Sequence, residues 1–197
     1  MEFNVVAAGI GGQGIVLFSE VLAKAMLAEG QNPSFYVHSG LAQLGGSVSS
    51  HIRAGDRICP KITHGCADVI LSLELAEILH AVPFLKRDGK VLISTSIQMP
   101  YHSTMNPDLY PTVETLTELF REGGVKPVFI PADTIAREAG HIQALNMVML
   151  GALVAVSNVV DTESAVKTIR ETIENGVDIN VEGFWKGYEF ISGKDYN

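Results

Sequence analysis

The sequence predicts an α/β protein with a Rossmann-like, mostly parallel sheet, helices on both faces and a helical C-terminal third. Two observations predict this class. Short apolar runs typical of strands alternate with segments whose apolar residues recur at helical spacing. From about residue 133 onward the spacing is almost entirely helical. We expect residues 1–197 to form a single domain, whose helical part covers about 133–197.

The first elements surround a cluster of glycines. Phe3–Ala8 is a short apolar, β-branched run and is predicted to be a strand. Ile15–Glu29 carries apolar residues at helical spacing, and Gly30 supplies the usual C-terminal glycine. Ser34–His38 is predicted to be the second strand, and the alternating Ser47–Ala54 a half-exposed third strand.

The middle of the chain contains two runs that are apolar almost throughout. Ala67–Leu73 and Val91–Thr95 are predicted to be strands covered on both faces, as in a parallel sheet. A helix is expected between them, from Glu74 to about Leu85. Ile97–Pro111 is rich in Pro, Ser, Thr and Asn and is predicted to be a loop, as is the glycine-containing Gly40–Gly46.

The last elements are mostly helices. Beside a short strand at Val128–Pro131, helices are expected at Thr112–Glu122, Asp133–Ala139, Ile142–Val156, from Asp161 or Thr162 to Asn175, and at Val181–Ile191. Ile142–Val156 is apolar nearly all round, so we expect it to be buried. The late aromatic residues Trp185 and Tyr188 suit either core packing or a partner interface.

Composition excludes several classes of function. The 197 residues include 14 Lys and Arg against 22 Asp and Glu, a formal charge of −8, and no basic cluster, so nucleic acid is not an expected partner. No run of about 18 apolar residues occurs, so we expect no membrane span. With only two cysteines and no secretory signature, we expect a cytoplasmic protein with reduced thiols.

The most distinctive motif, called the glycine turn below, consists of Gly9, Gly11, Gly12, Gln13 and Gly14. It satisfies G-x-G-x-x-G between a predicted strand and a predicted helix. Such glycines allow a tight turn whose backbone N–H groups face a ligand. The helix N-terminus adds unpaired donors and a partial positive charge. The glycine turn is therefore a candidate site for a phosphate or another anion.

Three interpretations of the glycine turn stay open. A dinucleotide site also needs an acidic residue at the end of the next strand, about 20 residues further on, to bind the ribose. The strand expected there ends at His38 and Ser39, without Asp, Glu or Arg. The glycines otherwise serve close packing of the helix on the sheet, or contact with another anion or a subunit. His38 is the histidine best placed beside the turn.

The sequence indicates no catalytic residue and no metal site. Cys59 and Cys66 are too few to ligate an iron–sulfur cluster within this chain. His64 lies beside them, but a zinc site would still lack ligands. The six histidines form no local Ser–His–Asp set, and no G-x-S-x-G motif occurs.

Three stretches, taken in order, resemble a known family. They are Ala8–Gly14, then His38–Val48 followed by His51–Arg53, and then Gly65–Leu71 with Glu74 and Glu77 just after. This order is similar to the gamma-type subunit of 2-oxoacid:ferredoxin oxidoreductases. The Ala-Gln-x-Gly-Gly-Ser-Val form of the second stretch most resembles the beta subunit of indolepyruvate ferredoxin oxidoreductase. Asn146–Gly151 also resembles a late helix of that family.

The resemblance implies a non-catalytic small subunit in a complex that oxidatively decarboxylates 2-oxoacids, of the indolepyruvate or arylpyruvate type, in anaerobic metabolism. The products are an acyl-CoA and reduced ferredoxin. Thiamine diphosphate, [4Fe–4S] clusters and coenzyme A are expected with a large partner subunit, and no cofactor is expected in this chain. The glycine turn is a candidate to help hold an anionic group such as coenzyme A.

One position departs from the family pattern. The family usually has Arg-Gly-Gly in the second stretch, where this chain has Leu44. An arginine there would pair with an anion or with a partner subunit, which leucine cannot do. This departure leaves open an interaction or sensor protein of the same fold. A free-standing nucleotide- or dinucleotide-binding protein is the other alternative, and the missing acidic residue after Val37 argues against it.

Overall fold

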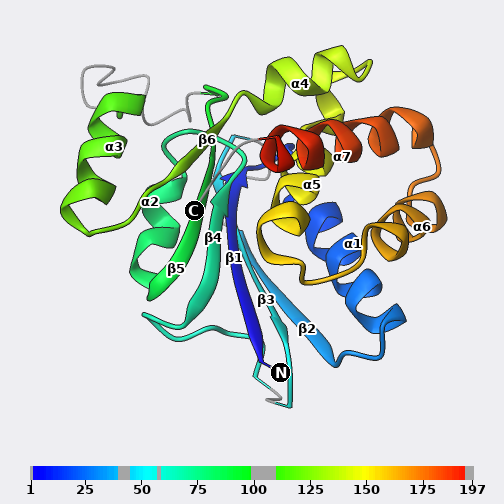
Figure 1. Cartoon of the computed structure of the whole chain (residues 1–197), viewed down its shortest axis with the longest axis horizontal. Coiled ribbons are helices and arrows are strands. Elements are labelled where there is room, and N and C mark those ends of the chain that lie inside the picture. The colour runs from blue at the N-terminus through cyan, green and yellow to red at the C-terminus, as the bar shows by residue number, and fades with distance from the viewer. Residues whose placement is uncertain (1, 40–44, 57–58, 99–109, 194–197) are drawn as a thin grey trace.

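The computed structural model describes residues 2–39, 45–56, 59–98 and 110–193. Within these ranges six strands form a mixed sheet in the order β2-β3-β1-β4-β5-β6 (Figure 1). The strands are β1 (Phe3–Ile10), β2 (Pro33–Ser39), β3 (Ser47–Ala54), β4 (Ala67–Ser72), β5 (Leu85–Ser94) and β6 (Val128–Ile130). Strands β1, β4, β5 and β6 are parallel, whereas β3 is antiparallel to both of its neighbours. The mostly parallel sheet is as predicted.

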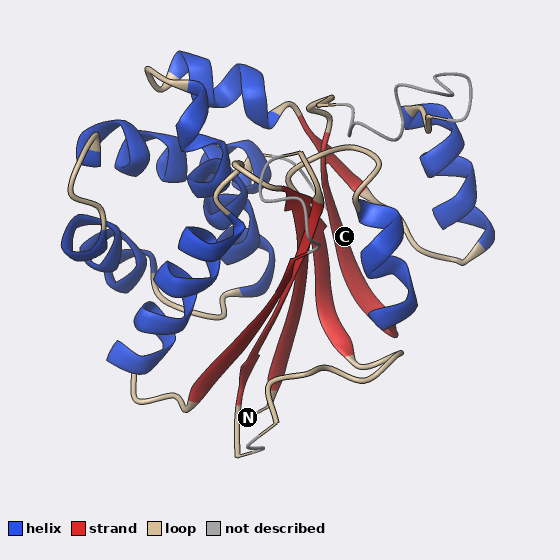
Figure 2. Ribbon diagram, turned by 180° about the vertical axis from the view of Figure 1, so that it is seen from behind, coloured by secondary structure: helices blue, strands red, loops and turns tan. Residues whose placement is uncertain are grey.

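Helices cover both faces of the sheet (Figure 2). They are α1 (Ile15–Ala28), α2 (Ile78–Ala81), α3 (Val113–Glu122), α4 (Ala132–Glu138), α5 (Leu145–Ser157), α6 (Thr162–Thr172) and α7 (Val177–Ser192). Helices α1 and α4–α7 pack on one face, and α2 and α3 on the other. In the described part of the chain, no helix combines the length and apolar character needed to cross a bilayer.

The central strand β1 supplies side chains to both layers. Val5 and Ala7 belong to the core under α1 and α5, and Val6 and Ala8 belong to the core under α2. These four side chains are almost completely buried. Successive side chains of a strand point to opposite faces, so an unbroken apolar run is what a strand covered on both faces requires.

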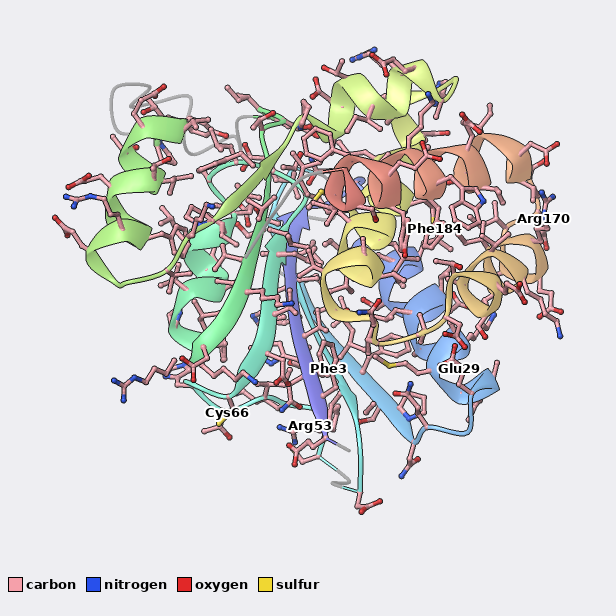
Figure 3. The ribbon with its side chains drawn as sticks, in the orientation of Figure 1. Phe3, Glu29, Arg53, Cys66, Arg170 and Phe184 are labelled. Carbon is pink, nitrogen blue, oxygen red and sulfur yellow. The ribbon has the colours of Figure 1, made fainter. Side chains whose placement is uncertain are left out.

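The C-terminal helices α5 and α7 pack with their backbones unusually close together. A Cβ atom added at Gly151 of α5 would lie 1.9 Å from the carbonyl oxygen of Phe184, and one at Gly187 of α7 would lie 2.0 Å from that of Val148. Phe184 itself is fully buried beside this contact (Figure 3). The burial predicted for the Ile142–Val156 segment is confirmed, because Leu145–Val154 is buried throughout.

The helix predicted from Glu74 to about Leu85 is wrong. Only α2 and the 3₁₀ helix Val82–Phe84 occur there, and β5 already begins at Leu85. The carboxylate of Glu74 accepts hydrogen bonds from the next backbone N–H groups, which turns the chain before a helix can start. Pro83 then lacks the N–H that an α-helix would need.

Other helix boundaries differ by smaller amounts. The Thr112 N-cap is confirmed: its Oγ1 accepts from the N–H of Thr115 at 3.2 Å. The last helix begins at Val177 rather than Val181, after the left-handed Gly176. The predicted loop Gly40–Gly46, which contains Leu44, falls largely outside the described residues, as does most of the loop Ile97–Pro111.

Candidate functional site

The glycine turn lies at the carboxyl end of β1, beside the carboxyl end of β4. The chain leaves β1 through α1 toward one face of the sheet, and leaves β4 through α2 toward the other. Open α/β sheets bind ligands at such a point of divergence, outside the carboxyl ends of the strands. The topology therefore makes this edge the candidate functional site.

The backbone of the glycine turn requires glycine at two positions. Gly12 has φ of 102° and Gly14 has φ of 84°, conformations that residues with a Cβ rarely adopt. The N–H of Gly11 donates to the carbonyl oxygen of Gly46 at 2.8 Å. Because Gly46 directly precedes β3, this bond joins the first and second stretches of the family resemblance.

The side chain of Gln13 forms hydrogen bonds with the backbone at the ends of both β1 and β4. Its Oε1 accepts from the N–H of Ile10 at 2.8 Å, and its Nε2 donates to the carbonyl oxygen of Leu73 at 3.4 Å. A Cβ atom at Gly9 would lie 3.0 Å from Oε1 of Gln13. Gln13 and Gly9 therefore shape the turn and link the ends of β1 and β4.

The N-terminus of α1 offers free donors. Gly14 is its N-cap and provides no side-chain cap. Within the described residues, the N–H groups of Gly12 and of the first turn of α1 donate to no backbone carbonyl. The side chain of Asn146, at the start of α5, donates through Nδ2 to the carbonyl oxygen of Gly14 at 3.2 Å. The free N–H groups are thus available to an acceptor from outside the turn.

A cleft of about 530 Å³ opens beside the glycine turn. Its walls come from the turn and the start of α1, from the segment after β5, from the helices α4, α5 and α7, and from the segments that precede α5 and α7. Arg137 of α4 lines it with a positive charge and Asp133 with a negative one, among the amide side chains of Gln98, Gln143, Asn146, Asn175 and Asn180. Amide donors and a guanidinium group suit a polar ligand that carries a negative group.

Glu74 is a buried carboxyl group at the same edge. Its Oε2 accepts from the N–H groups of Ala76 (2.8 Å) and Glu77 (3.2 Å). Its Oε1 accepts from the N–H of Gln98 (3.3 Å) and from the hydroxyl of Tyr110. Burial raises the pKa of Glu74 to about 7, although these backbone hydrogen bonds act in the opposite direction. Glu74 therefore holds together the segments that follow β4 and β5.

Glu77 ties the same edge to β3. Its Oε1 accepts from Oγ of Ser47 at 2.9 Å, and its carboxylate is almost completely buried. Sequence reasoning named Glu74 and Glu77 only as part of the resemblance. Two carboxyl groups directly after a buried strand were the available signal, because such positions lie at the ligand-binding edge of a parallel sheet.

The strand order separates His38 from the place where a dinucleotide ribose would bind. In a dinucleotide-binding sheet the second strand lies directly beside the first. Here β3 lies between β2 and β1 and runs antiparallel to both. His38 is exposed near the end of β2, with Nδ1 3.4 Å from the hydroxyl of Tyr36. The glycine turn thus lacks the neighbouring strand end that a dinucleotide site uses.

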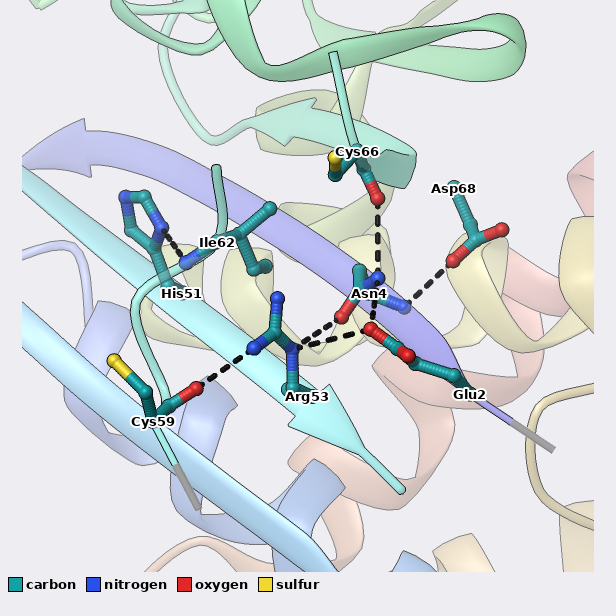
Figure 4. Close-up of polar contacts among 8 residues, drawn as sticks. All are labelled: Glu2, Asn4, His51, Arg53, Cys59, Ile62, Cys66 and Asp68. Atoms are coloured by element: carbon teal, nitrogen blue, oxygen red, sulfur yellow. Dashed lines mark hydrogen bonds and ion pairs between the residues drawn. The ribbon is translucent and has the colours of Figure 1, made fainter. Parts of the chain in front are cut away.

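The two cysteines lie at the other end of the sheet from the glycine turn, because Cys66 directly precedes β4 and Cys59 follows β3, which is antiparallel to β1. Figure 4 shows the polar contacts made by their backbone carbonyl groups. The buried Arg53 donates to Oδ1 of Asn4 at 2.7 Å and to the carbonyl oxygen of Cys59 at 2.8 Å. Asn4 donates in turn to the carbonyl oxygen of Cys66 at 3.1 Å. Both thiols are free and exposed. Among the residues described, no group of three or more His, Cys, Asp or Glu side chains is arranged to bind a metal ion.

Comparison with known proteins gives consistent matches over nearly the whole chain. Residues 4–190 match the family model of pyruvate ferredoxin/flavodoxin oxidoreductase. Indolepyruvate oxidoreductase subunit IorB of Methanothermobacter thermautotrophicus is 33% identical over 190 residues, which cover 95% of this chain and 97% of that protein. IorB of Archaeoglobus fulgidus is 34% identical over 197 residues, which cover 98% of each chain.

A solved structure gives the same result. Pyruvate oxidoreductase subunit PORC from Thermotoga maritima superimposes with a TM-score of 0.71 at 25% identity, covering 95% of this chain and 96% of that one. The sheet, the glycine turn and the three ordered stretches all lie within the matched range. The chain therefore belongs to the pyruvate ferredoxin/flavodoxin oxidoreductase family, as a gamma-type subunit of a 2-oxoacid:ferredoxin oxidoreductase.

Proposed function

We propose that this chain is the non-catalytic small subunit of an indolepyruvate or arylpyruvate ferredoxin oxidoreductase in the cytoplasm, and that residues 1–197 act as one gamma-type domain. The observation that carries the choice of substrate is the near full-length similarity to two IorB proteins. A large partner subunit holds thiamine diphosphate and the [4Fe–4S] clusters. The family match supports this assignment, and the chain's own two cysteines, fewer than the four thiolates that such a cluster needs, are compatible with it.

Affinity purification from the native cell tests the partnership. We expect the tagged chain to bring down a larger, cysteine-rich subunit, identified by mass, and the purified chain alone to turn over no 2-oxoacid. The substrate is tested by comparing kcat/KM of the complex for indolepyruvate, pyruvate and 2-oxoglutarate. Indolepyruvate should have the highest value. Turnover by the isolated chain contradicts the non-catalytic role, and a preference for pyruvate contradicts the substrate.

We also propose that the glycine turn, Gly9, Gly11, Gly12, Gln13 and Gly14, helps to hold an anionic group such as a phosphate of coenzyme A. The supporting observation is the set of free N–H groups at Gly12 and the start of α1, which border a cleft that also contains Arg137. Helix N-termini and guanidinium groups are both favourable partners for phosphate. Gly9 and Gln13 contribute by shaping the turn.

Substitution at Gly12 in the intact complex tests this site. Gly12→Asp places a negative charge beside the free N–H groups, whereas Gly12→Ala imposes the same backbone strain without the charge. We expect KM for coenzyme A to rise about tenfold more in the first variant than in the second, as for the loss of one charge-assisted contact. Arg137→Gln should also raise it. Equal KM values in the two Gly12 variants, with subunit assembly unchanged, contradict the proposal.

A further inference from the structure

Strand β2 is an edge strand of the sheet, and within the described residues it pairs only with β3 (Figures 1 and 2). It is seven residues long and extended throughout. Phe35 and Tyr36 on it are 39% and 42% exposed. An edge strand of this kind leaves a row of backbone N–H and C=O groups available for pairing with another strand.

The hydrogen-bond alternation identifies which groups face outward. The N–H of Gly55 donates to the carbonyl oxygen of Asn32 at 3.0 Å, one step beyond the β2–β3 ladder and in the same register. In an antiparallel pair only every second residue bonds to its neighbour. The even-numbered residues of β2 therefore bond to β3, and Pro33, Phe35, Val37 and Ser39 direct their backbone groups away from the sheet.

Within the described residues, β2 itself lacks the charges and the internal proline that usually block strand pairing. Pro33–Ser39 contains no Asp, Glu, Lys or Arg, whereas natural edge strands commonly carry lysine or other charges that prevent pairing with another chain. The single proline stands at the first position of the strand, where its missing N–H removes only a terminal bond. A hollow at the carboxyl end of β2, between that strand, the start of β3 and the start of α1, is lined in part by Val16, Val37 and Val48.

We propose that two copies of this chain associate by antiparallel pairing of β2 with β2, so that their sheets become continuous. Pairing over the full strand places a two-fold axis at Tyr36. Phe35 and Val37 of one copy then exchange hydrogen bonds with Val37 and Phe35 of the other. At each end the N–H of Ser39 donates to the carbonyl oxygen of Pro33. Every outward N–H of β2 thus meets an outward carbonyl.

The side chains suit the same two-fold arrangement. Tyr36 lies opposite the second Tyr36 as a non-hydrogen-bonded pair, in which side chains approach closely and aromatic pairs are favourable. Each copy carries a formal charge of −8, so a contact between copies needs a neutral surface, and β2 provides one. This self-complementarity favours a second copy over an unrelated partner, because a two-fold contact uses the same patch on both sides.

Cysteine cross-linking tests the pairing and its register in the full-length chain. The exposed Cys59 and Cys66 are first replaced by serine. Tyr36→Cys places two thiols opposite each other, with Cα atoms about 4.5 Å apart, within the range that a disulfide spans. The matched control Phe35→Cys faces Val37 of the other copy. We expect a covalent dimer from Tyr36→Cys on mild oxidation and at least tenfold less from Phe35→Cys. Similar yields from both variants, or no dimer from either, overturn the proposal.

Sedimentation of the otherwise unaltered chain and of the purified complex supplies the second measurement. Tyr36→Lys puts like charges directly opposite each other on the axis, so the dimer dissociation constant should rise at least tenfold, whereas Tyr36→Phe should retain the dimer. The circular dichroism spectrum of Tyr36→Lys shows whether the monomer is folded. A monomeric wild-type chain overturns the proposal. The proposal is also overturned if the Tyr36→Lys variant still forms the dimer but no longer binds the large subunit.

Discussion

Gly187→Ala should destabilise the protein strongly, although alanine is the better helix former. Taken alone, the exchange in a helix interior should stabilise by roughly 0.5–1 kcal/mol. The new Cβ would lie 2.0 Å from the carbonyl oxygen of Val148, whereas ordinary contacts begin near 3.4 Å. Helix α7 must therefore move away from α5 by about 1.4 Å. Overpacking of this kind typically costs about 1–3 kcal/mol, and parting the helices also loosens the buried Phe184. We expect a net loss of about 2 kcal/mol or more.

The same exchange one turn earlier is the matched control. At Gly183 the nearest atom to an added Cβ is the Cβ of Ala144 at 3.1 Å, and the carbonyl oxygen of Ala144 follows at 3.3 Å. A shift of a few tenths of an ångström relieves this contact, so Gly183→Ala should change the free energy of unfolding by less than about 1 kcal/mol.

Urea unfolding followed by circular dichroism measures both variants. In thermal melts of a protein of this size each kcal/mol corresponds to about 2–4 °C in Tm, so Gly187→Ala should melt at least ~4 °C below the wild type. Gly151→Ala should resemble it, since its Cβ would lie 1.9 Å from the carbonyl oxygen of Phe184. The double variant should lose less than the sum, because helices already parted accommodate the second methyl group. Equal stability of Gly187→Ala and Gly183→Ala refutes the close-contact argument.

Three further predictions concern the two ends of the sheet. Gly14→Ala should lower the free energy of unfolding by about 2 kcal/mol or more, because φ is 84° and the new Cβ would lie 2.3 Å from Nδ2 of Asn146. Adding Asn146→Ala removes that contact and should restore part of the lost stability in thermal melts. The native pKa of Glu74, about 7, exceeds its ordinary value of 4.5, so the folded state retains a proton that the unfolded state loses. Stability should therefore fall by up to about 3 kcal/mol as the pH rises from below 4.5 to above 7. Glu74→Gln should remove most of this slope in urea titrations at several pH values, and an unchanged slope assigns it to another group. Arg53→Ala leaves Oδ1 of the buried Asn4 and the carbonyl oxygen of Cys59 without their donor, and it should lower the free energy of unfolding by about 1–3 kcal/mol, whereas the exposed Arg87→Ala should change it little in the same assay.

Local pattern was sufficient to predict most of the elements, because strands covered on both faces are apolar without interruption. Val69–Leu71 of β4 and Val5–Ala8 of β1 are such runs. The position of β3 between β2 and β1 was not predicted. Strand pairing joins distant segments, and the hydrophobic pattern of a strand does not show which other strand it pairs with. The long helix expected after Glu74 failed for a local reason, namely a side chain that competes for backbone N–H groups.

The candidate site was predicted in part. The glycine turn followed from its spacing, and its left-handed glycines agree with the expected tight turn. The partners that complete the edge, Glu74, Asn146 and Arg137, come from distant segments whose meeting depends on the tertiary fold. Glu74 and Asn146 were named only as part of the family resemblance, and Arg137 is an ordinary polar residue of its helix that no short motif could identify.

The hydrogen bond between Asn146 and Gly14 spans 132 residues of sequence, and this affects the order in which the protein matures. During translation the glycine turn leaves the ribosome early, whereas Asn146 is made much later. Until α5 docks, the N-terminus of α1 has no support on that side. A ribosome-bound fragment that stops before residue 146 should therefore display an open glycine turn, and the proposed anion site would be complete only after α5 has docked.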